Sequence, residues 1–377
     1  APAAPALSPD TSTGRTPGRG AVCWRGAGGS PAELKPPAAA GPTGSRCHTD
    51  GFQPLLLALA MTQRPAVLQT ISLMPWLEER LRADYEVTLL PPAGPEREAF
   101  IAARAGEFEA VVTSAGGGIS NALIDALPNL RVISSFGVGL DKVDPVHAGR
   151  RGIPVGYTPD VLNDCVADAA WALLMDAARR VSAADRFVRR GDWLKGTFPL
   201  STRVSGKRLG IVGLGRIGRV VARRAMGFDM EIRYHNRRPV ADVSYGYAPT
   251  LLELADWADF LVVISAGGPE TRHLIDAKVL QALGPQGFLV NVSRGSVVDE
   301  SALVQALQSG AIAGAGLDVF EDEPRVPQAL WALDNVVLLP HVASATHETR
   351  RAMGELVLEN LASFFETGRV KVAAPAA

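Results

Sequence analysis

The stretch Arg208-Leu-Gly-Ile-Val-Gly-Leu-Gly-Arg-Ile-Gly218 decides the fold. Its first half is typical of a buried strand, and the Gly213-x-Gly215-x-x-Gly218 spacing then opens a helix. In such a unit the first glycine permits a tight turn, the second lets the backbone approach a pyrophosphate, and the third lets helix and strand pack closely. The amides of Arg216 and Ile217 would then face the phosphates at the positive end of the helix. We predict a dinucleotide-binding turn; the alternative is a glycine-rich turn that binds no ligand.

On both sides of this stretch, apolar strand-like runs alternate with amphipathic helical segments, which predicts parallel sheets flanked by helices. The expected strands cover residues 66–70, 85–90, 110–113, 131–135 and 153–156, then 208–212, 231–234, 260–264, 288–292, 313–317 and 336–339. Expected helices cover 75–82, 120–127, 161–189, 217–226, 250–255, 276–283, 300–309 and 346–366. The fold class is α/β, with two doubly wound parallel-sheet domains. A Rossmann-type nucleotide domain is inserted into a flavodoxin-like substrate domain.

The length of 377 residues is too great for one compact core and favours two domains. We expect a substrate domain over residues 61–159 and 345–377, and a dinucleotide-binding domain over 160–344. Residues 1–60 are rich in Ala, Gly, Pro, Arg and Ser and lack periodicity, so we expect a disordered or non-native extension there, with Met61 starting the functional protein.

The composition argues against several classes of protein. A formal net charge of −1 gives no electrostatic reason to expect nucleic acid or an anionic membrane as a partner. The sequence holds no apolar run of the roughly 20 residues that a membrane span needs. The spacing of Cys23, Cys47 and Cys165 matches neither a disulfide framework nor a zinc site. We therefore expect no metal, and a reducing, cytoplasmic location.

The segment Tyr234-His-Asn-Arg-Arg-Pro239 bears on the choice of cofactor. A carboxylate at the end of this strand would select the 2′-hydroxyl of NAD. Asn236 stands there instead, and Arg237 and Arg238 follow it. Loss of a negative charge and gain of two cations favour a 2′-phosphate, so we predict NADPH, with NADH as the less preferred cofactor. The alternative is that both arginines are solvated surface residues.

Three residues that follow later strands suggest hydride transfer to a carbonyl beside a carboxylate. They are Arg294, Glu323 and His341, in this order. The guanidinium can bind a carboxylate at two points and polarise the ketone, the imidazole can supply the proton, and the carboxylate can keep that imidazole charged. Each residue alone has a simpler explanation: an ion pair for Arg294, a surface position for Glu323, and a packed or surface histidine for His341.

Several motifs resemble the D-isomer-specific 2-hydroxyacid dehydrogenase family. The resemblance covers nearly everything from Met61 to Val370. It is carried by the glycine turn and by Ser134-Ser-Phe-Gly-Val-Gly-Leu-Asp141, Asn163-Asp-Cys-Val-Ala-Asp168, Asn291-Val-Ser-Arg-Gly295, Gly316-Leu-Asp-Val-Phe320 and Pro340-His341. Further stretches look like the NADPH-dependent hydroxypyruvate, glyoxylate and hydroxyphenylpyruvate reductases. They are Tyr157-Thr-Pro-Asp-Val161, Arg189-Arg-Gly-Asp-Trp193, Ser205-Gly-Lys-Arg208 and Leu338-Leu-Pro-His341.

The resemblance implies roles for individual residues. Arg294 would bind the substrate carboxylate and carbonyl, His341 would be the general acid, and Glu323 would pair with it. Amides around Val138 and Gly139 would hold the carboxylate. Cofactor contacts would come from the glycine turn and the Asn236 segment, and from positions near the nicotinamide or the histidine, namely Ser293, Asp318 and Ser344. A homodimer is also implied. The glycine-rich loop Ser114–Gly118 departs from the family pattern and leaves the substrate size open.

We therefore expect a reductase that converts a small 2-oxo acid to the D-2-hydroxy acid with NADPH. One alternative is a related enzyme that uses another member of the substrate class, or NADH. A second is a nucleotide-sensing binding protein, since transcriptional corepressors share this scaffold. A methyltransferase with a glycine-rich site would not explain Arg294, Glu323 and His341.

Overall fold

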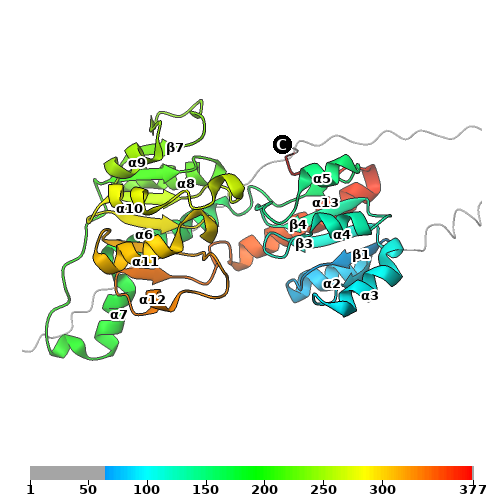
Figure 1. Cartoon of the computed structure of the whole chain (residues 1–377), viewed down its shortest axis with the longest axis horizontal. Helices are drawn as coiled ribbons and strands as arrows, with labels where there is room; N and C mark the ends of the chain where they lie inside the picture. Colours follow the sequence, from blue (N-terminus) through cyan, green and yellow to red (C-terminus); the bar gives the residue numbers. More distant parts are fainter. Residues whose placement is uncertain (1–63, 376–377) are drawn as a thin grey trace, which may run out of the picture. The chain divides into compact units, whose positions relative to one another are not determined.

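Two parallel β-sheets, each flanked by helices, form the part of the chain that the structure describes, residues 64–375 (Figure 1). The structure is a computed structural model. The expectation for residues 1–60 lies outside the described residues. The fold class predicted from the sequence is confirmed, with sheets of five and seven strands.

The five-stranded sheet has the order β2-β1-β3-β4-β5, which is the flavodoxin-like order. Its strands are β1 Ala66–Gln69, β2 Glu86–Leu89, β3 Ala110–Ser114, β4 Val132–Phe136 and β5 Val155–Gly156. The helices along this part of the chain are α2 Pro75–Asp84, α3 Pro95–Arg104, α4 Asn121–Ala126 and α5 Pro145–Arg150. The last helix, α13 His347–Thr367, packs against β4 and α2.

The seven-stranded sheet has the order β12-β11-β10-β9-β6-β7-β8. Its strands are β6 Arg208–Val212, β7 Glu231–His235, β8 Gly246–Tyr247, β9 Phe260–Val263, β10 Phe288–Asn291, β11 Gly314–Leu317 and β12 Val336–Leu338. Counted from β6, this is the Rossmann order extended by one strand. Its helices are α6 Asn163–Arg179, α7 Val181–Arg189, α8 Arg216–Ala225, α9 Leu251–Trp257, α10 Ala277–Leu283, α11 Glu300–Ser309 and α12 Gln328–Trp331.

Side-chain alternation places an apolar layer on each face of the larger sheet. Leu289 of β10 belongs to the core with α9, α10 and α11, whereas the next residue, Val290, belongs to the core with α6 and α8. Leu261 and Val262 of β9 alternate in the same way. Because successive side chains of a strand point to opposite faces, a strand buried on both faces is apolar throughout, as the sequences of β9 and β10 are.

The helix that we predicted over residues 161–189 is two helices in the structure. α6 ends at Arg179 and α7 starts at Val181, and Arg180 between them is left-handed, with φ 55°. The Asp176 carboxylate accepts a hydrogen bond from the Ser182 amide at 2.8 Å, which supports the start of α7. The sequence does not show this break because neither glycine nor proline marks it.

Four short or surface elements were not predicted. They are α3, α5, α12 and the two-residue strand β8. None of the side chains of α3 is buried, and its only partly buried apolar residues are Phe100 and Ile101. A helix with so narrow an apolar stripe has little periodicity to detect. No helix within the described residues is long and apolar enough to cross a membrane.

Candidate active site

The loops that follow the carboxyl ends of the strands line a cleft of about 1390 Å³. The loops after β4 and β6 contribute Gly139 and Gly215, and those after β10, β11 and β12 contribute Arg294, Glu323 and His341. Because all strands within each sheet are parallel, these loops lie at the carboxyl edges, where open α/β sheets bind ligands.

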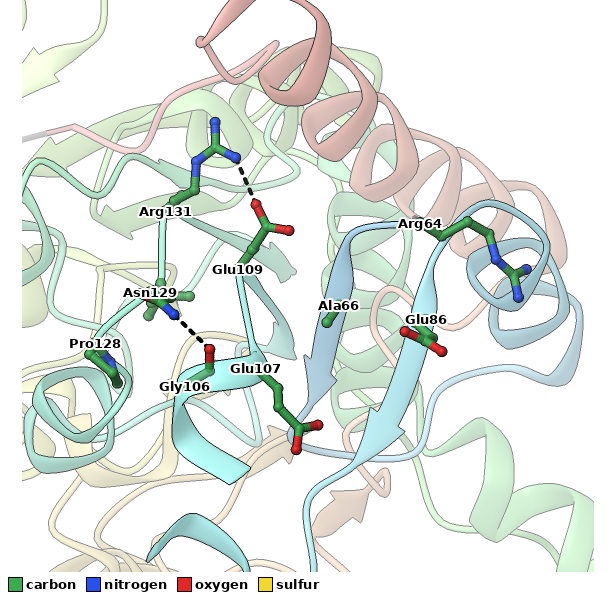
Figure 2. A pocket seen from close by; sticks show the side chains of 10 residues that line it. Arg64, Ala66, Glu86, Gly106, Glu107, Glu109, Pro128, Asn129 and Arg131 are labelled. Carbon is green, nitrogen blue, oxygen red and sulfur yellow. Dashed lines mark hydrogen bonds and ion pairs between the residues drawn. The ribbon is translucent and has the colours of Figure 1, made fainter. Parts of the chain in front are cut away.

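A second depression lies at the opposite, amino-terminal edge of the smaller sheet (Figure 2). Of its five charged side chains, four already have partners within the protein, including Glu107, which pairs with Arg104 at 2.7 Å. Arg131 pairs with Glu109 at 2.7 Å, and Arg64 donates to the carbonyls of Arg82 and Ala83. We therefore place the functional site at the carboxyl-edge cleft.

The three glycines of the turn have different surroundings. Gly213 has φ +101°, and an added Cβ would lie 2.8 Å from the Ser265 amide nitrogen. A Cβ on Gly218 would lie 2.4 Å from the carbonyl oxygen of Gly213. A Cβ on Gly215 would meet no atom within 4 Å, so the backbone there is open to the cleft. The surroundings fit a turn whose middle glycine leaves room for a pyrophosphate and whose other two glycines serve the fold.

Arg216 and Ile217 form the first turn of α8, where helix amides lack intrahelical partners and can bind an anion. The side chain of Arg216 is held to one side. Its Nε pairs with Asp160 at 3.1 Å, and its Nη1 donates to the hydroxyl of Tyr157 at 3.3 Å. The cation thus joins the glycine turn to the segment that leads into α6.

Asn236 has a structural contact that its sequence position did not suggest. Its side-chain oxygen accepts a hydrogen bond from the Leu214 amide at 2.7 Å, so it braces the glycine turn. Arg237 is exposed and pairs with Glu270 at 2.7 Å, and Arg238 is exposed beside it. Glu270 lies in the short 3₁₀ helix Pro269–Thr271 after β9 and was not identified from the sequence.

The loop that carries Arg294 is shaped by a buried amide. The side chain of Asn291 donates to the carbonyl of Arg294 at 3.0 Å and accepts from the amide and hydroxyl of Ser293. Ser293 is therefore buried against Asn291. The Arg294 guanidinium donates through Nε to Asp141 at 2.6 Å and through Nη1 to the Ser293 carbonyl at 2.7 Å. Asp141 belongs to the loop after β4.

His341 and Glu323 form a hydrogen-bonded pair. The distance from His341 Nδ1 to Glu323 Oε2 is 2.7 Å, and the other carboxylate oxygen accepts from the Phe320 amide at 3.1 Å. The side chain of His341 is 45% exposed, which leaves its ring accessible from the cleft. With Nδ1 bound to the carboxylate, Nε2 is the ring nitrogen available to a ligand.

The charge of Glu323 is favoured by its neighbours. Burial by itself would raise the pKa of this carboxyl, but the hydrogen bonds from His341 and the Phe320 amide, together with the charges of His341 and Arg294, outweigh it. The pKa of Glu323 therefore lies below its ordinary value, and the group is a carboxylate at neutral pH.

Asp318 holds the backbone that presents the histidine. It is buried, and its two carboxylate oxygens accept from the amides of Val342 and Ala343 at 2.7 and 2.9 Å. Its backbone carbonyl accepts from the His341 amide at 2.8 Å. Burial raises the pKa of Asp318, although both amide bonds oppose this shift. His341 has φ +54°, a left-handed conformation that these bonds stabilise. Ser344 follows directly and lines the cleft.

Val138 and Gly139 follow β4 and face the same cleft. Within the described part of the chain, neither backbone amide donates to another group. The sequence thus predicted the residues that converge on the cleft. It did not predict the contacts made by Asp141, the Phe320 amide and Glu270. No spacing rule links Asp141 or Glu270 to its partner, because each of these two contacts joins loops from different strands. The Phe320 amide and Glu323 lie three residues apart on one loop.

Comparisons with known proteins identify the family of the chain. Residues 171–343 match the family model described as D-isomer specific 2-hydroxyacid dehydrogenase, NAD binding domain. The chain is 50% identical over 271 residues to hydroxyphenylpyruvate reductase of Plectranthus scutellarioides, an alignment that covers 72% of the chain and 87% of the relative. The chain belongs to the D-isomer-specific 2-hydroxyacid dehydrogenase family. It is an oxidoreductase of that family, as the resemblance predicted.

Two further relatives support the assignment. Glyoxylate/hydroxypyruvate reductase A of Arabidopsis thaliana is 46% identical, with 79% of the chain and 95% of the relative aligned. The NADPH-dependent glyoxylate/hydroxypyruvate reductase of Sinorhizobium meliloti, solved with NADP and malonate, is 44% identical with a TM-score of 0.79. That match covers 83% of this chain and 98% of the other. These relatives are named as reductases, so the comparisons do not favour a corepressor-like binding protein.

Proposed function

We propose that this protein reduces a small 2-oxo acid of the glyoxylate, hydroxypyruvate or hydroxyphenylpyruvate class to the D-2-hydroxy acid, with NADPH as the preferred cofactor. The observation that carries the proposal is the convergence of Arg294 and the His341–Glu323 pair on one cleft beside the glycine turn. The three relatives named above support the substrate class, because their names state reduction of these acids.

The roles of the residues follow from their atoms. Val138 and Gly139 offer backbone amides to the substrate carboxylate, and Arg294 adds a cation that polarises the C2 carbonyl. When bound, the reduced nicotinamide supplies the hydride to C2. His341 donates its proton from Nε2 to the carbonyl oxygen, and the Glu323 carboxylate stabilises the protonated imidazole. The balanced reaction consumes one 2-oxo acid, one NADPH and one proton, and yields the 2-hydroxy acid and NADP⁺.

Residues that would hold NADPH line one edge of the cleft. The open backbone at Gly215 and the first-turn amides of Arg216 and Ile217 fit the pyrophosphate, with Gly213 and Gly218 shaping the turn. Arg237 and Arg238 would meet the 2′-phosphate, and Asn236 adds no negative charge to repel it. Ser293, Asp318 and Ser344 would lie on the nicotinamide side.

We also propose the domain division expected from the sequence, with residues 61–159 and 345–377 as the substrate domain and 160–344 as the dinucleotide-binding domain. The packing of α6 on α8, β10 and β11 supports one boundary, and the packing of α13 on β4 and α2 supports the other. A cytoplasmic location is proposed because the spacing of the cysteines suits a reducing compartment.

A homodimer is proposed for the assembled enzyme. Of the thirteen large apolar side chains that are exposed in the described residues, five lie between residues 181 and 200. They are Val181, Val188, Trp193, Leu194 and Leu200. We call this segment, residues 181–200, the arm. An apolar surface of this kind is typical of a protein–protein interface.

A substrate and cofactor panel tests the proposed function. Glyoxylate, hydroxypyruvate, pyruvate and hydroxyphenylpyruvate are each assayed with NADPH and with NADH. We expect turnover with at least one of these acids, a higher kcat/KM with NADPH, and a product of D configuration. Binding of the cofactor without turnover of any acid would contradict the proposal and favour a sensor.

A further inference from the structure

The Arg294 guanidinium is held by two protein acceptors that leave one of its edges free. Nε donates to Asp141 and Nη1 donates to the Ser293 carbonyl. The remaining nitrogen, Nη2, points at Gly139, where an added Cβ would lie only 1.6 Å away. The donors left for a ligand are therefore both N–H groups of Nη2, beside Gly139, and the second N–H of Nη1.

Two glycines and one carboxylate form the slot in which this side chain lies. A Cβ on Gly267 would lie 2.7 Å from Cγ of Arg294 and 2.9 Å from the carboxylate of Asp141. Gly139 and Gly267 thus leave room for the arginine, and Asp141 fixes its rotation. The side chains of Arg294 and Asp141 are only 28% and 22% exposed, so solvent screens the pair less than it screens a surface ion pair.

The pair also joins two parts of the fold. Asp141 follows β4 of the five-stranded sheet, and Arg294 follows β10 of the seven-stranded sheet. A long arginine side chain has several rotamers, and a charge-assisted bond at Nε selects one of them. Without Asp141, the guanidinium would be free to turn away from Gly139.

We propose that Asp141 is a positioning residue, which holds Arg294 so that Nη2 and the Val138–Gly139 amides bind the same substrate carboxylate. Asp141 does not itself bind the substrate, because its carboxylate would repel the carboxylate of a 2-oxo acid. Its effect is therefore exerted through Arg294. The inference rests on the proposed function and deepens it by naming a residue that controls substrate recognition.

The test is a double-mutant cycle of Asp141→Asn and Arg294→Gln, read by turnover of a 2-oxo acid and by binding of oxamate to the NADPH complex. Asp141→Asn should lower kcat/KM and weaken oxamate binding by about 10–100-fold, as expected when a substrate-orienting group is misplaced. In the Arg294→Gln background the same change should cost less than about twofold, because no guanidinium remains to be oriented. The dissociation constant of NADPH should stay unchanged in Asp141→Asn.

Asp144→Asn is the matched control. Asp144 lies on the same loop and carries the same charge, but it caps α5 through the amides of Val146 and His147. Its variant should show kinetics close to those of the wild type. Asp141→Glu keeps the charge but moves it by one methylene, so it should lose less kcat/KM and less oxamate affinity than Asp141→Asn. It replaces Asp141→Asn in the cycle if that variant does not fold.

Three results would overturn the inference. They are unchanged or tighter oxamate binding in Asp141→Asn, an equal loss in both Arg294 backgrounds, and an equal loss in Asp144→Asn. Absence of turnover in the wild type would contradict the proposed function instead. In that case the cycle measured by oxamate binding still decides whether Asp141 acts through Arg294.

Discussion

At the scale of single residues, the pairing of His341 with Glu323 predicts how the reaction depends on pH. Reduction needs a protonated imidazole, so its rate should hold at low pH and fall as pH rises. Burial opposes the shift, but the hydrogen bonds from His341 and the Phe320 amide hold the pKa of Glu323 below its ordinary value, so a carboxylate faces His341 at neutral pH.

Replacing Glu323 by Gln keeps its size and removes its charge, so the fall in rate should move to lower pH. The measurement is the rate of the hydride step by stopped flow across pH, at saturating NADPH. His341→Gln should lose about 10²–10⁴-fold in kcat while it still binds NADPH, because the glycine turn is intact. An unmoved profile in the Glu323 variant would contradict the pairing.

The Arg237–Glu270 pair predicts a change in cofactor use. A 2′-phosphate must share or replace Glu270 as the partner of Arg237, since the carboxylate lies 2.7 Å from it. Glu270→Gln should therefore lower the KM for NADPH by about 1.5–5-fold, the range set by an exposed ion pair. The KM for NADH is the internal control and should not change.

The complementary change removes both cations. If the bound 2′-phosphate partly buries each charge-assisted contact, neutral residues in place of Arg237 and Arg238 should weaken use of NADPH by about 1.5–3 kcal/mol and should affect NADH far less. Equal losses with both cofactors would mean that the two arginines do not bind the 2′-phosphate.

At the scale of elements, the same substitution should have different effects at Gly215 and Gly218: one weakens cofactor binding and the other lowers stability. A Cβ on Gly218 would lie 2.4 Å from a backbone oxygen, so Gly218→Ala should lower the free energy of unfolding by about 1–3 kcal/mol. Gly215→Ala meets no atom within 4 Å and should leave stability within about 0.5 kcal/mol, while it weakens NADPH binding by blocking the pyrophosphate. Thermal unfolding and cofactor titration of both variants check this. A destabilised Gly215 variant that binds NADPH normally would contradict it.

The elements also show why part of the fold could be predicted from the sequence. β9 and β10 are buried on both faces, so both are apolar throughout. Because helical segments separate these apolar runs in the sequence, the runs predict strands of a parallel sheet. The break at Arg180 depends on a side-chain bond from Asp176 to the amide of Ser182, and the short β8 depends on pairing with β7. Such features arise from tertiary contacts that local patterns do not record.

At the scale of the whole molecule, the sequence again predicts only the part of the site that does not depend on tertiary contacts. Arg294, Glu323 and His341 could be nominated because each follows a strand and parallel strands place their following loops at one edge. Asp141 lies 153 residues before its partner Arg294, in the loop after a strand of the other sheet. Only the folded chain shows that contact, although Asp141 was already part of a motif that carried the family resemblance.

The arm predicts the oligomeric state. Leu194 and Leu200 are 95% and 99% exposed, and burying two such side chains in an interface is worth about 1.5–3 kcal/mol each. Light scattering after gel filtration should give twice the mass of one chain for the wild type. Leu194→Glu combined with Leu200→Glu should give the mass of one chain, because each change places a charge in the interface. Leu252→Glu, an exposed position on α9, is the matched control and should remain dimeric. A dimer that survives both changes in the arm would move the interface elsewhere.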